Sequence, residues 1–246
     1  MAQPEQKHID FRNNYLNVVD RIAKAAKSVG RNPDSISLVV VTKTHTVDSI
    51  QAVIDAGAIN LGENYIEEAI PKINLLKHNP DIKWHMIGHV QSRKAAYIIE
   101  YFQYLHSLDS VKLAEKINRN AVESNKIIPV WLEMNVGGEI TKSGWNIYED
   151  VNWVNIIPDL EKIIVLPGLM LKGLMTIPPF SVDPETSRLY YKKLRTFQEF
   201  LIKEFNLINF NGLSMGMSAD YEIAIQEGST CVRVGQAIFG PRINYK

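Results

Sequence analysis

Apolar and polar residues follow two alternating periods along this chain. Short runs rich in β-branched residues, typical of buried parallel strands, are separated by longer segments whose apolar residues recur every three or four positions, as in amphipathic helices. Eight runs are expected to be strands, at residues 36–42, 58–62, 83–88, 104–107, 128–136, 170–176, 212–215 and 230–234. Helices are expected at residues 15–29, 47–56, 92–102, 111–124 and 184–205.

This alternation predicts repeated βα units around a parallel sheet. An open doubly wound nucleotide-binding sheet would give the same pattern and remains the alternative, although no Gly-x-Gly-x-x-Gly follows the first strand. Eight evenly distributed strands favour closure into a single (β/α)₈ TIM-type barrel, preceded by an extra N-terminal helix. A length of 246 residues with 46% hydrophobic residues suits one such domain, and we expect it to span residues 1–246.

Composition narrows the function classes. Lysine plus arginine and aspartate plus glutamate are equal at 27 each, so no overall charge draws the protein to nucleic acid or to an anionic membrane. No apolar run approaches the roughly 20 residues that span a bilayer, and the first residues lack the apolar core of a signal peptide, so we expect a cytoplasmic protein. The single cysteine, Cys231, excludes an internal disulfide and is better read as a buried strand residue than as a nucleophile.

Functional groups of such barrels lie at the carboxyl ends of the strands, where each apolar run turns polar. The first strand ends in Thr42-Lys43-Thr44-His45. A lysine partly buried at the barrel mouth has its pKa lowered by desolvation, which frees the amine to attack a carbonyl and form a Schiff base. On this position alone, a surface lysine that extends into solvent from a strand end is the simpler interpretation.

The second and third strand ends carry further polar groups. The second ends in an acid, an amide and a phenol (Glu63, Asn64, Tyr65), and four histidines lie near strand ends (His45, His85, His89, His106). The histidines raise the question of a metal site, but no His-x-His pair or carboxylate-rich cluster accompanies them, so we expect no metal. His85 either faces the site from inside the barrel or is a hydrogen-bonded core residue.

The last two units hold the most specific patterns. Two serines and a glycine lie in Leu213-Ser-Met-Gly-Met-Ser-Ala-Asp220, and a strand-to-helix turn lies in Val232-Arg-Val-Gly-Gln-Ala-Ile-Phe-Gly240. Barrels commonly bind phosphate at these two loops, although N-caps and tight turns use the same residues. Because the eighth strand closes onto the first, a phosphorylated aldehyde would reach both this cradle and Lys43. Arg233 would face the ring or the phosphate, or form a salt bridge beneath the loops.

Taken together, the motifs resemble those of the pyridoxal phosphate homeostasis proteins, single-domain relatives of the amino-terminal barrel of alanine racemase with a fold-type-III-like site for pyridoxal 5′-phosphate (PLP). The resemblance covers almost the whole chain. It rests on Val41-Thr-Lys-Thr, Gly62-Glu-Asn-Tyr, Trp84-His-Met-Ile-Gly, Gln91-Ser-Arg-Lys, Lys142-Ser-Gly, Gly173-Leu-Met-Thr-Ile-Pro and the two loops just described.

The resemblance implies a cofactor-binding set. Lys43 would hold PLP as a Schiff base, and Arg233 would approach the pyridine nitrogen, which weakens the ring as an electron sink. Asn64 and His85 are the further cofactor-binding candidates on the second and third strands. The phosphate would lie among Ser214, Gly216, Met217, Ser218, Gly235 and Gln236. Three positions depart from the usual pattern: His45 stands at a frequent lysine, His89 at a frequent proline and Arg93 at a frequent asparagine.

Three functions fit a lysine with a phosphate cradle: a protein that carries, buffers or regulates intracellular PLP for vitamin B6 homeostasis, a weak PLP-dependent amino-acid racemase, and a Schiff-base aldolase acting on a sugar phosphate. Racemisation needs two opposed proton-transfer groups, and alanine racemase takes the second from another domain. Because the chain ends soon after the last expected strand, we favour the carrier, with apo PLP-dependent enzymes as recipients and a monomeric state. Tyr65, His85 and His45 remain conceivable second bases, and Lys142 is the alternative attachment point.

Overall fold

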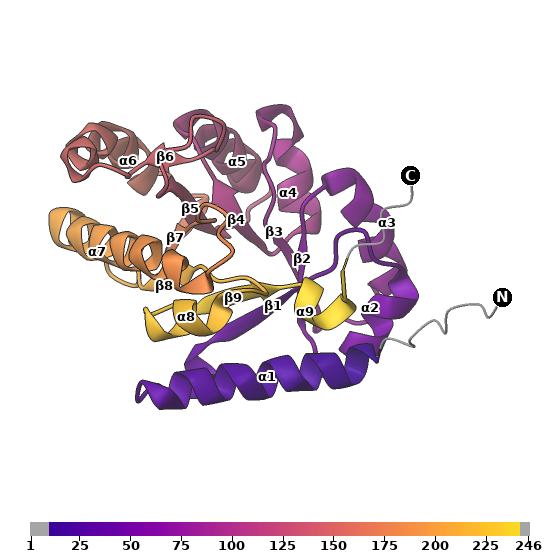
Figure 1. Cartoon of the computed structure of the whole chain (residues 1–246). Helices are drawn as coiled ribbons and strands as arrows, with labels where there is room; N and C mark the ends of the chain where they lie inside the picture. The colour runs from indigo at the N-terminus through magenta and orange to yellow at the C-terminus, as the bar shows by residue number, and fades with distance from the viewer. Residues whose placement is uncertain (1–9, 242–246) are drawn as a thin grey trace.

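The strands of the computed structural model, which describes residues 10–241, form a parallel barrel (Figure 1). Neighbours in the sheet follow the order β4-β3-β2-β1-β9-β8-β7-β5, and a β4–β5 pairing closes the ring. The strands of the ring are β1 (Ser37–Val41), β2 (Asn60–Glu63), β3 (Lys83–Met86), β4 (Tyr104–Leu108), β5 (Ile128–Asn135), β7 (Leu169–Met175), β8 (Gly212–Ser214) and β9 (Cys231–Val234). Each matches one predicted strand, so the barrel is confirmed and the doubly wound alternative is wrong.

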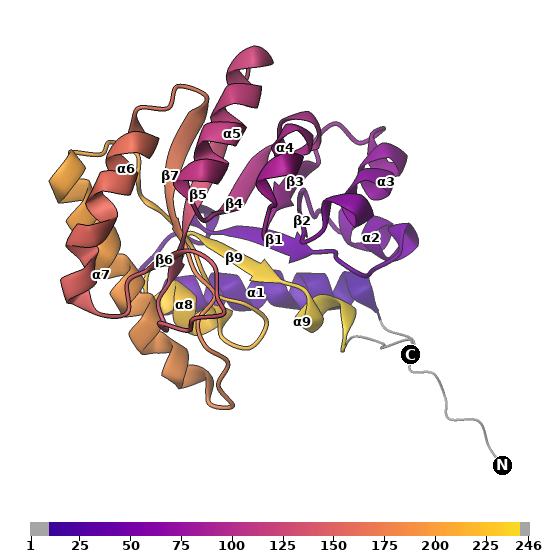
Figure 2. The same ribbon diagram turned by 90° about the horizontal axis from the view of Figure 1, so that it is seen from above.

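Helices cover the outside of the barrel, and those between the first and the last of them connect consecutive strands of the ring (Figures 1 and 2). They are α1 (Phe11–Ser28), α2 (Val47–Ile54), α3 (Ile66–Leu76), α4 (Ala95–Tyr101), α5 (Val111–Glu123), α6 (Ile157–Ile164), α7 (Ser187–Phe205), α8 (Tyr221–Gln226) and α9 (Gln236–Phe239). Short 3₁₀ helices occur at η1 (Pro33–Ser35), η2 (Ser92–Lys94), η3 (Asp150–Ile156) and η4 (Pro184–Thr186). The predicted helices 92–102 and 184–205 therefore each begin with a 3₁₀ turn.

The extra helix α1 lies across the seam between the first and last strands and packs on α2, α8 and α9 (Figure 1). It begins earlier than the apolar pattern indicates, because Asp10 caps it by accepting the Asn13 N–H at 3.0 Å. At the same end, the amide of Asn14 donates to the carbonyl of Ile238 in α9 at 2.9 Å. The helix thus supports α9, which follows the eighth strand of the ring.

A short strand, β6 (Trp145–Asn146), lies outside the ring and pairs with the end of β5. It belongs to the long connection between β5 and α6. Parallel strands all present their carboxyl ends at one rim of the barrel, so the turns after β1, β8 and β9 meet there. That rim is where the candidate residues are found.

Candidate functional site

The turn that carries Lys43 begins directly after β1. Its first residue, Thr42, donates its N–H to the carbonyl of Gly62 at 2.9 Å, which continues the β1–β2 ladder by one residue. The turn closes when the N–H of His45 donates to the carbonyl of Thr42 at 3.2 Å. Lys43 is half-buried at this point, and the ring of His45 stacks on Phe239 of α9 with centroids 4.2 Å apart. The lysine therefore lies at the rim, beside the last helix.

The loop after β8 is shaped by a glycine and an aspartate. Gly216 has a φ of +97°, and a Cβ there would lie 2.6 Å from Cβ of Ala224, so the loop needs glycine to pack against α8. Its carbonyl accepts the N–H of Arg233 at 3.0 Å. Asp220 Oδ1 accepts the N–H of Met217 at 2.8 Å, and its Oδ2 accepts the hydroxyl of Ser187 at 2.9 Å. Both oxygens of the Asp220 carboxylate therefore accept hydrogen bonds from the protein itself.

The loop after β9 is the second of the two loops that the sequence predicts as a phosphate cradle. Gly235 caps α9, and a Cβ at this position would lie 3.1 Å from the carbonyl oxygen of Val41, so the start of α9 is pressed against the end of β1. The hydroxyl of Ser218 accepts the N–H of Ala237 at 3.2 Å and joins the two loops. The N–H of Gln236, in the first turn of α9, has no partner within the helix. Neutral donors of this kind suit a phosphate.

Arg233 lies beneath the cradle and is fully enclosed by protein. Its Nη1 donates to the hydroxyl oxygen of Ser214 at 2.6 Å and its Nη2 to the carbonyl of Thr176 at 2.8 Å. Burial lowers the pKa of the guanidinium, which stays protonated all the same. Ser214 is 0% exposed and holds Arg233 from below. The predicted contact of Ser214 with phosphate stays a prediction.

A chain of hydrogen bonds runs from Arg233 through the barrel interior. The hydroxyl of Ser214 bonds Nδ1 of His106 at 2.7 Å, Nε2 of His106 bonds Nδ1 of His85 at 2.9 Å, and Nε2 of His85 bonds Oδ1 of Asn60 at 3.2 Å. If both rings are neutral, the Asn60 oxygen accepts the Nε2 proton of His85, so Nδ1 of His85 accepts from Nε2 of His106 and Nδ1 of His106 accepts the hydroxyl proton of Ser214. Burial agrees with neutral rings, since it lowers the pKa of His85 to about 3 and that of His106 well below its usual value.

His85 is therefore a hydrogen-bonded core residue, the second of its two readings. It is 4% exposed and its ring stacks on Tyr104 with centroids 4.4 Å apart. His106 links it to the hydroxyl of Ser214, and its predicted contact with the cofactor stays a prediction. His106 stacks on Trp131 at 4.2 Å and was noticed in the sequence only as one of four histidines near strand ends.

The remaining candidates lie around the same rim. Asn64 is half-buried, and a Cβ on Gly88 would lie 2.3 Å from its carbonyl oxygen, so the loops after β2 and β3 pack closely. Tyr65 is 60% exposed. Arg93, one of the departures, donates from Nε to the side-chain oxygen of Gln91 at 3.1 Å. Its charge stays on the outside of the third loop.

Sequence reasoning missed an acidic group on β5. Burial raises the pKa of Glu133 to about 7, with a smaller contribution from the charge of Asp109. Asp109 also accepts from Nδ1 of His89 at 2.8 Å, so the histidine that replaces the usual proline has a carboxylate partner. The signal in the sequence was a lone charged residue within the apolar run 128–136. A carboxyl group that exchanges its proton near neutral pH therefore lies on this side of the barrel.

Replacing Glu133 with glutamine is expected to change how stability depends on pH. The folded carboxyl keeps its proton up to about pH 7, whereas the unfolded one releases it near 4.5, so wild-type stability from this group is present below pH 4.5 and lost as pH rises through 7. Between pH 5 and pH 8, the free energy of unfolding of wild type should therefore fall by about 2–3 kcal/mol relative to that of Glu133→Gln. Urea titrations of the apo protein measure this, with the exposed Glu161→Gln as control. Parallel curves for wild type and Glu133→Gln would contradict it.

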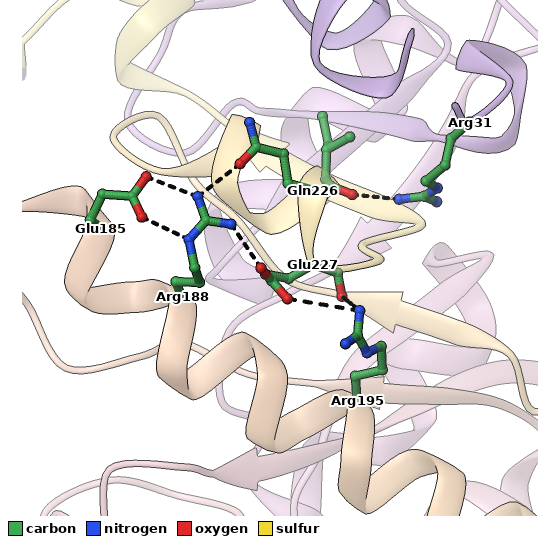
Figure 3. Close-up of polar contacts among 7 residues, drawn as sticks. Arg31, Glu185, Arg188, Arg195, Gln226 and Glu227 are labelled. Carbon is green, nitrogen blue, oxygen red and sulfur yellow. Dashed lines mark hydrogen bonds and ion pairs between the residues drawn. The ribbon is translucent and has the colours of Figure 1, made fainter. Parts of the chain in front are cut away.

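The loop after β8 is braced from outside by a cluster of charged side chains between α7 and α8 (Figure 3). Arg188 of α7 forms a bidentate pair with Glu185 at 2.7 and 2.9 Å, and also donates to Glu227 at 2.7 Å and to Gln226 at 2.8 Å. Glu227 and Gln226 lie at the end of α8, whose first turn follows Asp220. The cluster fixes α8 and, through it, the loop that begins at β8.

Two further features are absent from residues 10–241. No group of three or more His, Cys, Asp or Glu side chains in this part of the chain is placed to hold a metal ion. Over the same residues, no helix has both the length and the apolar character that crossing a bilayer requires.

A closed barrel with a lysine just after its first strand fits the class of barrels related to alanine racemase. The family model of the alanine racemase N-terminal domain matches residues 17–242. The alanine racemase of Clostridium difficile superposes with a TM-score of 0.66 at 15% identity, over 94% of this chain and 61% of the enzyme, which is a likeness of fold alone.

Relatives of higher sequence identity are named pyridoxal phosphate homeostasis proteins. The pyridoxal phosphate homeostasis protein of Aquifex aeolicus is 39% identical over 225 residues, 92% of this chain and 95% of the relative. That of Vibrio alginolyticus is 37% identical over 235 residues, 94% and 97% of the two chains. PipY of Synechococcus elongatus, solved with PLP bound, has a TM-score of 0.79 at 31% identity, over 91% of this chain and all of PipY. The chain belongs to the pyridoxal phosphate homeostasis protein family, as its motifs predicted.

Proposed function

We propose that this chain binds PLP covalently through Lys43 and carries or buffers it for vitamin B6 homeostasis. The observation that carries the proposal is the close approach of Gly235 to the carbonyl of Val41, which brings the proposed phosphate cradle at the start of α9 against the end of β1, two residues before Lys43. A ligand with a phosphate at one end and an aldehyde at the other fits this pair. We further propose that the chain acts as one barrel domain and as a cytoplasmic monomer.

Different residues would bind the two ends of PLP. The neutral donors of the cradle at Ser218, Gly235 and Gln236 would hold the phosphate, and the half-buried amine of Lys43 would take the aldehyde. When bound, PLP supplies an aldehyde that condenses with amines and a ring that withdraws electrons. Asn64 lies beside the third loop and would contact the ring edge. Met217 would contribute its backbone to the loop that surrounds the phosphate.

Arg233 disfavours transaminase-like chemistry on a bound PLP. Its guanidinium only donates hydrogen bonds, so a ring nitrogen that faces it is kept unprotonated. Two of its donors are held by Ser214 and the Thr176 carbonyl, which fixes its orientation. An unprotonated ring nitrogen stabilises a carbanion less well. This residue therefore supports a protein that holds PLP with little turnover.

The racemase reading receives less support from the candidate second bases. His85 is buried and neutral in the barrel interior, Tyr65 points largely into solvent, and His45 is stacked on Phe239. Proton transfer on the second face of a substrate needs a base held over that face. Racemisation is therefore the competing function, and deuterium exchange at the α-carbon of amino acids distinguishes it.

Spectroscopy and transfer assays test the proposal. Purified protein mixed with PLP is expected to develop a band near about 420 nm, typical of a PLP imine, and then to restore the activity of an apo PLP-dependent enzyme faster than the protein-free buffer does. Deuterium exchange at the α-carbon of amino acids should not exceed that with free PLP. A protein that stays colourless would overturn PLP binding and favour the aldolase; rapid exchange without transfer would favour the racemase.

A further inference from the structure

A buried ion network lies behind the turn that carries Lys43. Lys72 of α3 places its Nζ 2.8 Å from Oε1 of Glu63 and 2.6 Å from Oε1 of Glu68. The side chain of Lys72 is 9% exposed and that of Glu63 is 0% exposed. Glu63 ends β2, and Glu68 lies one turn before Lys72 on α3. The network therefore joins the strand next to β1 to the helix that follows it.

This network contacts the residues on both sides of Lys43. Before the lysine, Nζ of Lys72 donates to the carbonyl of Thr42 at 2.8 Å, and the hydroxyl of Thr42 donates to Oε1 of Glu63 at 2.7 Å. After the lysine, the N–H of Thr44 donates to Oε1 of Glu68. Both peptide groups that flank Lys43 are thus tied to α3 and β2. These contacts restrict the backbone at Lys43 and therefore limit the directions in which its side chain can extend.

The conformation that these contacts hold is unfavourable by itself. Thr44 has a φ of +66°, in the left-handed region that β-branched residues rarely adopt. A backbone in such a region persists only where its surroundings fix it, and such positions are often found at functional sites. The hydrogen bond from the Thr44 N–H to Glu68 is one of the contacts that fix it here. Without that bond, the turn is expected to relax and to carry Lys43 with it.

Stability alone is a poor explanation for this network. Desolvation raises the pKa of Glu63 despite the opposing effect of Lys72, and among the described residues Oε2 of Glu63 has no hydrogen-bond partner. Buried ion pairs often contribute no more to stability than apolar residues of similar volume, because taking the charges out of water is costly. A role in orienting the turn accounts for charges that an apolar contact could replace.

We propose that Glu63, Glu68 and Lys72 are positioning residues that orient Lys43 toward an aldehyde held in the phosphate cradle. The proposal rests on the proposed function, because it takes Lys43 as the attachment point. Orientation of reacting groups has large effects on rate, and a displacement of about 1 Å can cost roughly 100-fold. The network should therefore control how fast PLP becomes attached and leave the phosphate cradle, which lies on β8 and β9, unaffected.

Two substitutions break the network in different places. Lys72→Met keeps the apolar stem and removes the charge, and Glu68→Ala removes the acceptor of the Thr44 N–H. Glu68→Gln is the conservative counterpart, because its amide oxygen can still accept that N–H. The matched control is Lys193→Met, which removes a lysine that also donates to a carbonyl and a carboxylate, those of Tyr148 and Asp150, both at 2.8 Å.

Each variant is mixed with PLP, reduced with borohydride at timed intervals, and assayed for modified Lys43 by mass spectrometry. A second titration with pyridoxine 5′-phosphate, which has the phosphate but no aldehyde, measures the cradle alone. Lys72→Met and Glu68→Ala should attach PLP at least about tenfold more slowly. They should bind pyridoxine 5′-phosphate within about threefold of wild type, which is less than about 1 kcal/mol. Glu68→Gln should recover most of the lost rate, and Lys193→Met should match wild type.

The outcomes separate the two proposals. If wild type itself gains no modification on Lys43, the proposed function fails. If wild type is modified but Lys72→Met and Glu68→Ala attach PLP at its rate, the positioning role is overturned. A parallel loss of attachment and of pyridoxine 5′-phosphate binding in Glu68→Ala, or no recovery in Glu68→Gln, would also overturn it, because each indicates a general structural defect. Thermal unfolding of Glu68→Ala, whose side chain is partly exposed, confirms that the tested protein is folded.

Discussion

Lys43→Ala is expected to lose all covalent attachment of PLP at this position while it keeps most of its affinity for the phosphate. The amine is the only group that this substitution removes from the rim, and the cradle is built from other strands, at Gly216, Ser218 and Gly235. Absorbance near about 420 nm should therefore disappear. Affinity for pyridoxine 5′-phosphate should stay within about threefold. Mass spectrometry after borohydride reduction locates any lysine that remains modified.

Lys142→Ala is the control for this experiment. Lys142 lies in the loop after β5, where it pairs with Glu139 and donates to the carbonyl of Ile177 at 3.3 Å. We expect its substitution to leave the modification on Lys43 in place. Persistent attachment in Lys43→Ala that disappears only when Lys142 is also replaced would show that the attachment point was assigned to the wrong lysine.

Gly173→Ala is expected to be the most damaging conservative change in the barrel wall. Gly173 of β7 has a φ of +149°, and a Cβ there would lie 1.8 Å from the carbonyl oxygen of Gly212 on β8. This atom belongs to the backbone, so only movement of a strand can relieve the overlap. The free energy of unfolding should fall by about 4 kcal/mol or more, a loss that few single substitutions cause. Urea denaturation of the apo protein measures it.

Gly57→Ala isolates the conformational part of that effect. Gly57 has a φ of +105°, but no atom lies within 4 Å of where its Cβ would be. Alanine should therefore cost only about 1–2 kcal/mol there. Equal losses in Gly57→Ala and Gly173→Ala would contradict the close approach of β7 and β8. The consequence for the site is direct, since Trp131, which stacks on His106, is in register with Gly173.

The position of Lys43 shows which part of the site can be predicted from the sequence. Four apolar residues before the lysine predict a strand that ends there, and the observed strand ends at Val41. Because the carboxyl ends of parallel strands share one rim, the same reasoning placed the glycine-rich loops after β8 and β9 beside it. The interior was harder to predict. A strand pattern tells which residues face inward, but not that His85, His106, Ser214 and Arg233 meet, because they come from different strands.

The sequence by itself determined the barrel, five of its helices, the rim lysine and the family, since hydrophobic periodicity and turn residues act over short stretches of chain. Only the tertiary structure decided which polar groups touch one another across the barrel. Burial then set their protonation, as for Glu133 with its pKa raised to about 7 and His85 with its pKa lowered to about 3. The network of Lys72 around the Lys43 turn belongs to this second group, because desolvation and partner distance depend on elements that meet only in the folded chain.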